Sequence, residues 1–144
     1  MATKRIREKP HRLPEAAYCG KVVEVFVRCL FEAAADNRTE VAIYCFMPDH
    51  LHTILKGVDH LSRPKRAMNA FKYATDQWLA ANQPDFEWQE DYHDHIIRNG
   101  EDGDKHVVYI ACNPVRAGLV ESPLDYPSTG SSAADWRELL VTST

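Results

Sequence analysis

Residues 39–56 read TEVAIYCFMPDHLHTILK, and this stretch carries the clearest structural signal in the chain. Residues 39–47 are rich in β-branched and aromatic side chains, which are typical of a buried strand. Residues 50–56 alternate between polar and apolar side chains, as a strand with one buried face does. Because only Pro48 and Asp49 separate the two runs, we expect them to pair as an antiparallel hairpin.

The composition sets limits on the class of protein. A length of 144 residues with 44% hydrophobic and 26% charged residues predicts one globular domain, not a disordered chain or a coiled coil. No run approaches the roughly 18 apolar residues that a membrane-spanning helix needs. No apolar stretch follows the basic N-terminus, which argues against a secretory signal and predicts a cytoplasmic protein.

The four cysteines form no CxxC pair, which argues against a zinc knuckle. The net charge of −4 is unusual for a nucleic-acid-binding protein, although a local basic patch could still bind DNA.

Apolar side chains at helical spacing mark further elements around the hairpin. We expect helices at residues 21–35, 64–82 and 102–112, extended chain at 87–97, and short helices at 115–118 and 133–140. Residues 1–20, which include Pro10 and Pro14, are expected to be a basic irregular segment. The main domain is therefore predicted at residues 21–132, followed by a short helix and tail at residues 133–144.

His50 and His52 lie two residues apart on the second predicted strand, so their side chains should point to the same face. Two adjacent imidazoles can chelate zinc or manganese, or magnesium when oxygen ligands join them. Leu51, between them, would face the core. On its own, the pair is equally compatible with two surface histidines on an edge strand.

Tyr109 and Asn113 lie four residues apart, about one turn of a predicted helix. A phenol is a weak nucleophile at neutral pH, but a nearby metal ion can polarise a phosphodiester so that the phenol attacks it. The Asn113 amide oxygen could complete the metal shell. Taken alone, a core tyrosine and an asparagine that caps a helix before a proline explain the same residues.

Taken together, two stretches carry a family resemblance: MPDHLHTIL at residues 47–55 and YIACNPVRAGLV at residues 109–120. They resemble the single-tyrosine HUH transposases, especially the branch of REP-associated tyrosine transposases. Two further segments, WQEDYHDHIIR at 88–98 and residues 125–132, resemble the same family. The resemblance covers residues 39–132, and four motifs in the same order are improbable by chance.

The resemblance implies a metal-dependent enzyme that acts on single-stranded or hairpin DNA. It implies that Tyr109 attacks a phosphodiester and leaves a 5′-phosphotyrosine and a free 3′-hydroxyl. His50, His52 and Asn113 would hold a divalent ion, for which magnesium or manganese is expected. The covalent bond conserves the phosphodiester energy, so that strands can be rejoined without ATP.

Further side chains are candidates for contact with the DNA. Cations could follow its backbone and aromatic rings could stack on its bases, and the candidates are Arg116, Lys65, Arg66, Lys72, Trp88 and Tyr92. For each of these six residues, a solvated charge or a core aromatic is the simpler interpretation.

The resemblance also implies the fold class, an α+β domain of the HUH or palm-like type. It predicts an antiparallel sheet of four to five strands with helices packed mainly on one face. In the family a strand precedes the first helix and lies beside the histidine strand, whereas here the predicted helix begins directly after the irregular segment. We therefore expect the first strand to be altered, over residues 21–27, or absent. An absent strand would expose a sheet edge, which favours a homodimer.

Two other functions stay open at this point. An inactive or domesticated relative would bind structured single-stranded nucleic acid without cutting it, and the altered first strand favours that reading. A metal-dependent hydrolase of small phosphates would use the histidines but would leave Tyr109 without a role.

Overall fold

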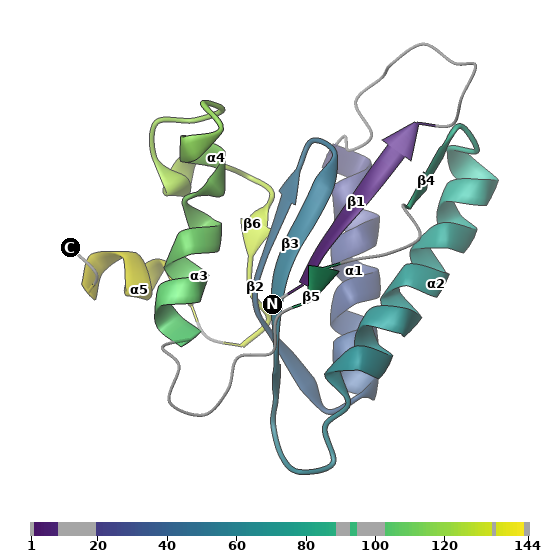
Figure 1. The fold of residues 1–144 in the computed structure, drawn as a ribbon, viewed down its shortest axis with the longest axis horizontal. Coiled ribbons are helices and arrows are strands. Elements are labelled where there is room, and N and C mark those ends of the chain that lie inside the picture. The colour runs from purple at the N-terminus through teal and green to yellow at the C-terminus, as the bar shows by residue number, and fades with distance from the viewer. Residues whose placement is uncertain (1, 9–19, 89–92, 95–102, 134, 143–144) are drawn as a thin grey trace.

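The computed structural model describes residues 2–8, 20–88, 93–94, 103–133 and 135–142 (Figure 1). Within these ranges the chain forms an α+β domain built on an antiparallel sheet, which confirms the predicted fold class. The sheet has six strands, and its order is β4-β1-β3-β2-β6 with β5 paired to β1. The count exceeds the predicted four to five because β5 and β6 are two-residue strands.

The predicted hairpin is present and lies at the centre of the sheet. Strands β2 (Thr39–Met47) and β3 (His50–Gly57) pair antiparallel, with Met47 opposite His50 at the turn. The pairing shifts register between Val41 and Ile43, where a β-bulge interrupts the alternation. Beyond the bulge, successive residues of β2 pack into two separate hydrophobic clusters, one on each face.

The expectation of an altered or absent first strand is wrong. Strand β1 (Ala2–Glu8) lies in the segment predicted to be irregular and pairs antiparallel with β3, with Arg5 opposite His50. On its other side β1 pairs with β4 (Phe86–Trp88) and β5 (His93–Asp94). The edge whose exposure favoured a homodimer is therefore covered, and that argument for a dimer no longer applies.

Two long helices cover one face of the sheet (Figure 1). They are α1 (Gly20–Asp36) and α2 (Pro64–Asn82), as the apolar spacing predicted. Phe26 of α1 is fully buried, and its ring lies 5.6–6.2 Å from the rings of four aromatic residues: Phe46, Phe71, Trp78 and Trp88. Aromatic packing of this kind removes a large apolar area from water and anchors both helices on the sheet.

The remaining helices lie on the other face and beside β6 (Thr129–Gly130) (Figure 1). Helix α3 (Gly103–Ala111) and helix α5 (Trp136–Thr142) bury Val107, Ile110 and Trp136 against β2. The segment predicted as a short C-terminal helix and tail therefore contributes to the core.

Between α3 and α5 run two short elements. They are helix α4 (Asn113–Arg116) and a 3-10 turn, η1 (Pro123–Asp125). Gly118 has a φ of 75°, the left-handed conformation expected of a glycine that ends a helix. Among the described residues, the structure contains no helix long and apolar enough to cross a membrane.

Candidate functional site

The two histidines of β3 converge on one point. The Nε2 atoms of His50 and His52 lie 3.0 Å apart, and the two rings are nearly perpendicular, at 88°. Their side chains share a face of β3 with Ile54, which packs in the same cluster as α3. The His50 side chain is only 15% exposed, so its orientation is held by its surroundings.

This separation fits a shared metal ion. Two ligands at right angles on an octahedral ion, each at about 2.1 Å, lie about 3.0 Å from one another. The same separation also suits a hydrogen bond between the rings when no ion is bound. From the described residues, no three His, Cys, Asp or Glu side chains converge. A third protein ligand from that part of the chain would therefore be of another type, such as an amide oxygen.

Asp49, which the sequence analysis did not single out, orients His50. Its Oδ1 lies 2.6 Å from His50 Nδ1 and accepts a hydrogen bond when that nitrogen is protonated. The neutral His50 ring then has its lone pair on Nε2, the atom that faces His52. A carboxylate that holds a histidine in this way is common around metal ligands. The sequence carried no usable signal, because adjacency along the chain does not show whether two side chains meet.

Tyr109 lies on the exposed side of α3. Its side chain is 58% exposed, whereas Val107, Ile110 and Ala111 of the same helix are buried. The guanidinium of Arg116 lies over the tyrosine ring, 3.9 Å from its centre, and donates a hydrogen bond of 2.6 Å to the Tyr109 carbonyl oxygen. The helix is thus on the histidine face of the sheet, but the phenol points outward from the helix.

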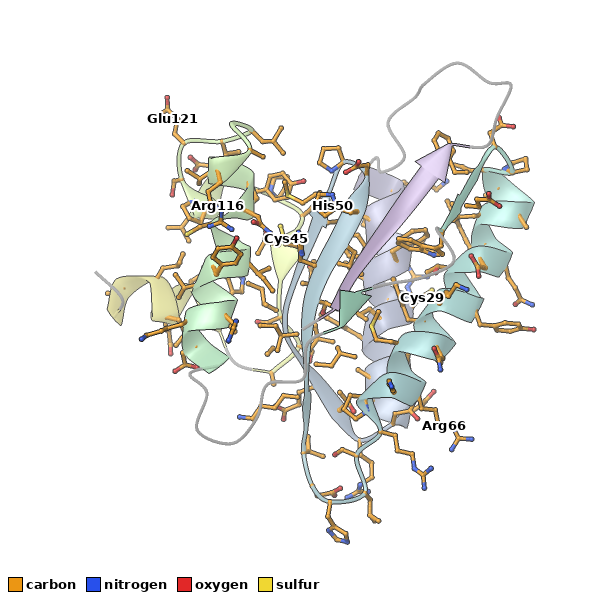
Figure 2. All side chains as sticks on the ribbon, in the orientation of Figure 1. Cys29, Cys45, His50, Arg66, Arg116 and Glu121 are labelled. Carbon is orange, nitrogen blue, oxygen red and sulfur yellow. The ribbon has the colours of Figure 1, made fainter. Side chains whose placement is uncertain are left out.

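Asn113 begins α4 and is partly engaged. Its Oδ1 accepts a hydrogen bond from Arg116, whereas its buried Nδ2 has no hydrogen-bond partner among the described residues. An unpaired buried amide group is costly. The arrangement brings together Tyr109, Asn113 and Arg116. Figure 2 shows Arg116 on the helical segment and His50 on the sheet, with Cys45 on β2 between them in that view.

Cys45 is buried in the hydrophobic cluster that also contains Ile110 of α3, and the half-buried Tyr126 packs against this cluster. The Tyr126 hydroxyl donates to the Phe46 carbonyl oxygen at 2.5 Å, and the Thr129 hydroxyl donates to Cys45 Sγ at 3.5 Å. Burial raises the pKa of Cys45 to about 11, against the opposing effects of the Thr129 hydrogen bond and the Arg116 charge. Burial, followed by the nearby Cys45 thiol, raises the pKa of Tyr126 to about 12. Burial therefore favours the neutral form of both groups.

The other predicted DNA contacts that the structure describes do not lie beside the histidines. Lys65, Arg66 and Lys72 lie on α2, which covers the face opposite the histidines. Lys72 lies 4.0 Å from the carboxylate of Asp76. Trp88 is only 4% exposed and donates a 2.6 Å hydrogen bond from Nε1 to Thr75 Oγ1, so in this structure its ring is not available for stacking on a base. Tyr92 lies outside the described residues.

Comparison with known proteins places this arrangement in a family. Residues 16–111 match the family model described as "Transposase IS200 like". The chain is 30% identical over 101 residues to the REP-associated tyrosine transposase of Escherichia coli strain K12, covering 68% of this chain and 58% of that protein. It is 26% identical over 99 residues to a putative REP-associated tyrosine transposase of Haemophilus influenzae, covering 61% and 56%.

A solved structure shares the fold. A chain described as the REP-associated tyrosine transposase bound to a REP hairpin superposes with a TM-score of 0.69, at 23% identity. The match covers 89% of this chain and 73% of the other. The present chain spans somewhat more than half the length of the two curated relatives. The family match extends over most of the chain and includes both histidines and Tyr109, and the chain belongs to the IS200-like transposase family.

Proposed function

We propose that the protein is a metal-dependent transposase that cuts and rejoins single-stranded DNA through a covalent bond to Tyr109. The observation that carries this proposal is the pair of imidazole nitrogens 3.0 Å apart on the sheet face that also packs against the tyrosine helix. A protein that only binds DNA needs neither a chelating pair nor an exposed phenol. The two relatives with the same family features are described as tyrosine transposases.

His50 and His52 would hold the ion, with the Asn113 amide oxygen as a third protein ligand. A divalent ion such as magnesium or manganese supplies charge neutralisation at the scissile phosphate. The donor set of two imidazoles and one amide suits either ion when water or phosphate oxygens complete the shell. For Asn113 to take part, its Oδ1 has to exchange the hydrogen bond from Arg116 for the ion.

Tyr109 would supply the nucleophile. Its Oη forms a bond to phosphorus while the bond from phosphorus to the 3′ oxygen breaks. The phenol loses its proton and the 3′ oxygen gains one, so that a 5′-phosphotyrosine and a 3′-hydroxyl result. Reversal of the same exchange with another 3′-hydroxyl joins a new pair of strands without an external energy source. Arg116, beside the phenol, would contact the phosphate that is attacked.

The substrate would be a hairpin whose unpaired foot reaches the histidines. The structural neighbour with the same fold is described as bound to a REP hairpin. A backbone phosphate of a single strand can reach an exposed phenol without any opening of the protein core.

The test is a covalent protein–DNA band on a denaturing gel. A labelled hairpin with an unpaired foot is incubated with the protein and magnesium or manganese. The band should form with the wild-type chain and vanish in Tyr109→Phe, in His50→Ala and in EDTA. Cleavage that survives Tyr109→Phe would instead indicate a metal-dependent hydrolase. Mixing Tyr109→Phe with His50→Ala asks whether two chains share a site, because only an assembly that exchanges tyrosines restores the band.

A second candidate function is binding of structured DNA without cutting. One observation favours it: Tyr109 points outward from α3, and Arg116 occupies the Asn113 oxygen that a metal ion would need. In that case the wild-type chain would shift a hairpin on a native gel, with or without EDTA, and would give no covalent band.

A further inference from the structure

A basic surface lies at the end of the sheet opposite the histidines. It is formed by the loop after β3 and the first turn of α2, and we call it the loop surface; its exposed residues are Val58, Asp59, His60, Leu61, Arg63, Pro64, Lys65 and Arg66. Figure 2 shows Arg66 and His50 toward opposite ends of the molecule. The loop surface is therefore separate from the candidate metal site.

The positive charges of the loop surface are not neutralised. Arg63, Lys65 and Arg66 are all exposed, and none of the three forms an ion pair within the described part of the chain. The one carboxylate in the loop, Asp59, is already paired with Arg38, and this pairing lowers the pKa of Asp59. In a chain with a net charge of −4, this end thus presents an excess of positive charge.

The residues at the start of α2 do not stabilise the N-terminus of this helix. The first turn of α2 contains no acidic residue, and the residue before it, Arg63, makes no side-chain capping hydrogen bond. Cations in the first turn repel the positive end of the helix dipole. An anion placed against these side chains would remove that repulsion, so the surface is better suited to an anionic partner than to water.

The loop is joined by hydrogen bonds to the α1–β2 turn. Arg38, in the left-handed conformation with a φ of 54°, accepts hydrogen bonds through its carbonyl oxygen from Val58 N at 3.1 Å and Ser62 Oγ at 2.5 Å. Arg63 N donates to the Asn37 carbonyl oxygen at 3.0 Å. Hydrogen bonds that already order a loop reduce the conformational entropy that is lost when it binds a partner. The loop also carries two apolar side chains, Val58 and Leu61, each of which is about half exposed to solvent.

From this charge pattern we propose that the loop surface binds the phosphate backbone of base-paired DNA, some distance from the cutting site. Residues 57–66 contain no Phe, Trp or Tyr on which unpaired bases could stack, and three clustered cations suit a duplex whose bases are stacked internally. The inference rests on the proposed function, because the same DNA molecule would supply the unpaired foot to the histidines and the paired stem to the loop surface.

The dimensions set the length of stem that is needed. Strand β3 has eight residues between the histidine end and the loop surface, which is about 25 Å at about 3.3 Å per residue. A DNA duplex rises about 3.4 Å per base pair. A stem of at least about seven base pairs is therefore required to reach both surfaces at once.

The experiment compares two variants that lose the same charge. Lys65→Gln/Arg66→Gln removes two cations of the loop surface, and Arg28→Gln/Arg137→Gln removes two exposed cations from α1 and α5. Fluorescence anisotropy measures the affinity for a hairpin with a ten-base-pair stem, for one with a four-base-pair stem, and for the unpaired foot alone. The sequence of the stem is arbitrary, since backbone contacts do not read bases.

We expect the loop variant to bind the long hairpin about tenfold more weakly at moderate salt, with a salt dependence smaller by about two in slope. Its affinity for the short hairpin and for the unpaired foot should stay within twofold of wild type. Its melting temperature should be unchanged or higher, because the cations that oppose the helix dipole are gone.

Four results would overturn the proposal. They are an equal loss in the control variant, an equal loss for the unpaired foot, an equal loss for the short hairpin, and no loss for the long hairpin. The covalent band with the unpaired foot is measured in parallel. Because that band tests the proposed chemistry alone, failure of the chemistry and failure of the loop surface are distinguishable.

Discussion

The guanidinium of Arg116 lies 3.9 Å from the centre of the Tyr109 ring and also donates a hydrogen bond to the side-chain oxygen of Asn113. A single cation therefore links the candidate nucleophile to a candidate metal ligand. In the resting protein this contact covers one face of the phenol and occupies the amide oxygen. In the proposed reaction, the Asn113 oxygen would have to exchange this hydrogen bond for the metal ion.

Removal of this cation should loosen the tyrosine and weaken attack on DNA. In Arg116→Ala, we expect loss of about 1 kcal/mol of stability, faster nitration of Tyr109 by tetranitromethane, and a lower yield of covalent adduct. The matched control is Arg137→Ala, whose guanidinium lies 5.3 Å from the Trp136 ring. Equal nitration rates in wild type and Arg116→Ala would show that the cation does not cover Tyr109 in solution.

Asp49 should control the tautomer of His50. In Asp49→Ala the hydrogen bond to Nδ1 is lost, so manganese affinity should fall by about 10- to 100-fold. Asp49→Asn keeps an oxygen acceptor and should lose much less. Calorimetry gives the affinities, and nitrogen-15 NMR of the metal-free protein reports which nitrogen of His50 carries the proton. Unchanged affinity in Asp49→Ala, with Asp135→Ala as the exposed control, would exclude this role.

Trp88→Phe should affect stability without affecting DNA binding. The substitution removes the hydrogen bond to Thr75 within the aromatic core, and we expect a loss of about 1–2 kcal/mol in urea unfolding. Because the indole is buried, affinity for unpaired DNA should be unchanged. Weaker DNA binding at unchanged stability would restore Trp88 as a residue that stacks on bases.

Alkaline pH should destabilise the protein through Cys45 and Tyr126. Folding raises the pKa of Cys45 from 9.0 to about 11 and that of Tyr126 from 10.0 to about 12. Each group binds its proton more tightly in the folded state. The resulting stability is therefore complete below the unfolded pKa and is lost as the pH rises from about 9 to about 12.

Urea midpoints measured between pH 8 and pH 11 test this dependence. The decline should be shallower in Cys45→Ala and in Tyr126→Phe than in the wild-type chain, although Tyr126→Phe starts lower because it loses the hydrogen bond to Phe46. An alkaline decline of the same slope in all three proteins would locate the effect in other groups.

Periodicity predicted most of the architecture because most elements bury a regular face. The spacing of apolar residues predicted strands at 39–47 and 50–56 and helices at 21–35 and 64–82, and the structure has each of them to within one residue at either end. Strand β1 was missed because its sequence, ATKRIRE, has only Ile6 as a large apolar residue. Its conformation is set by pairing with β3, β4 and β5, which no local pattern reveals.

The candidate site was predictable in its residue types but not in its contacts. The two histidines meet because alternation along a strand fixes their common face. The contact of Asp49 with His50 depends on side-chain rotamers, and that of Arg116 with Tyr109 depends on the chain turning between α3 and α4. Helical spacing placed Tyr109 and Asn113 one turn apart but did not show that the phenol points outward.

Strand β3 is hydrogen-bonded to β1 along one edge and to β2 along the other, and both pairings fix the direction in which the two imidazoles point. A slip of one residue along either partner would turn His50 and His52 into the apolar layer under α1 and α2 and would bring Leu51 out into water. Such a slip would have to break the ladders on both edges at once. The alignment of the two imidazoles is thus set by the hydrogen bonds of the sheet and does not depend on the conformation of the neighbouring loops.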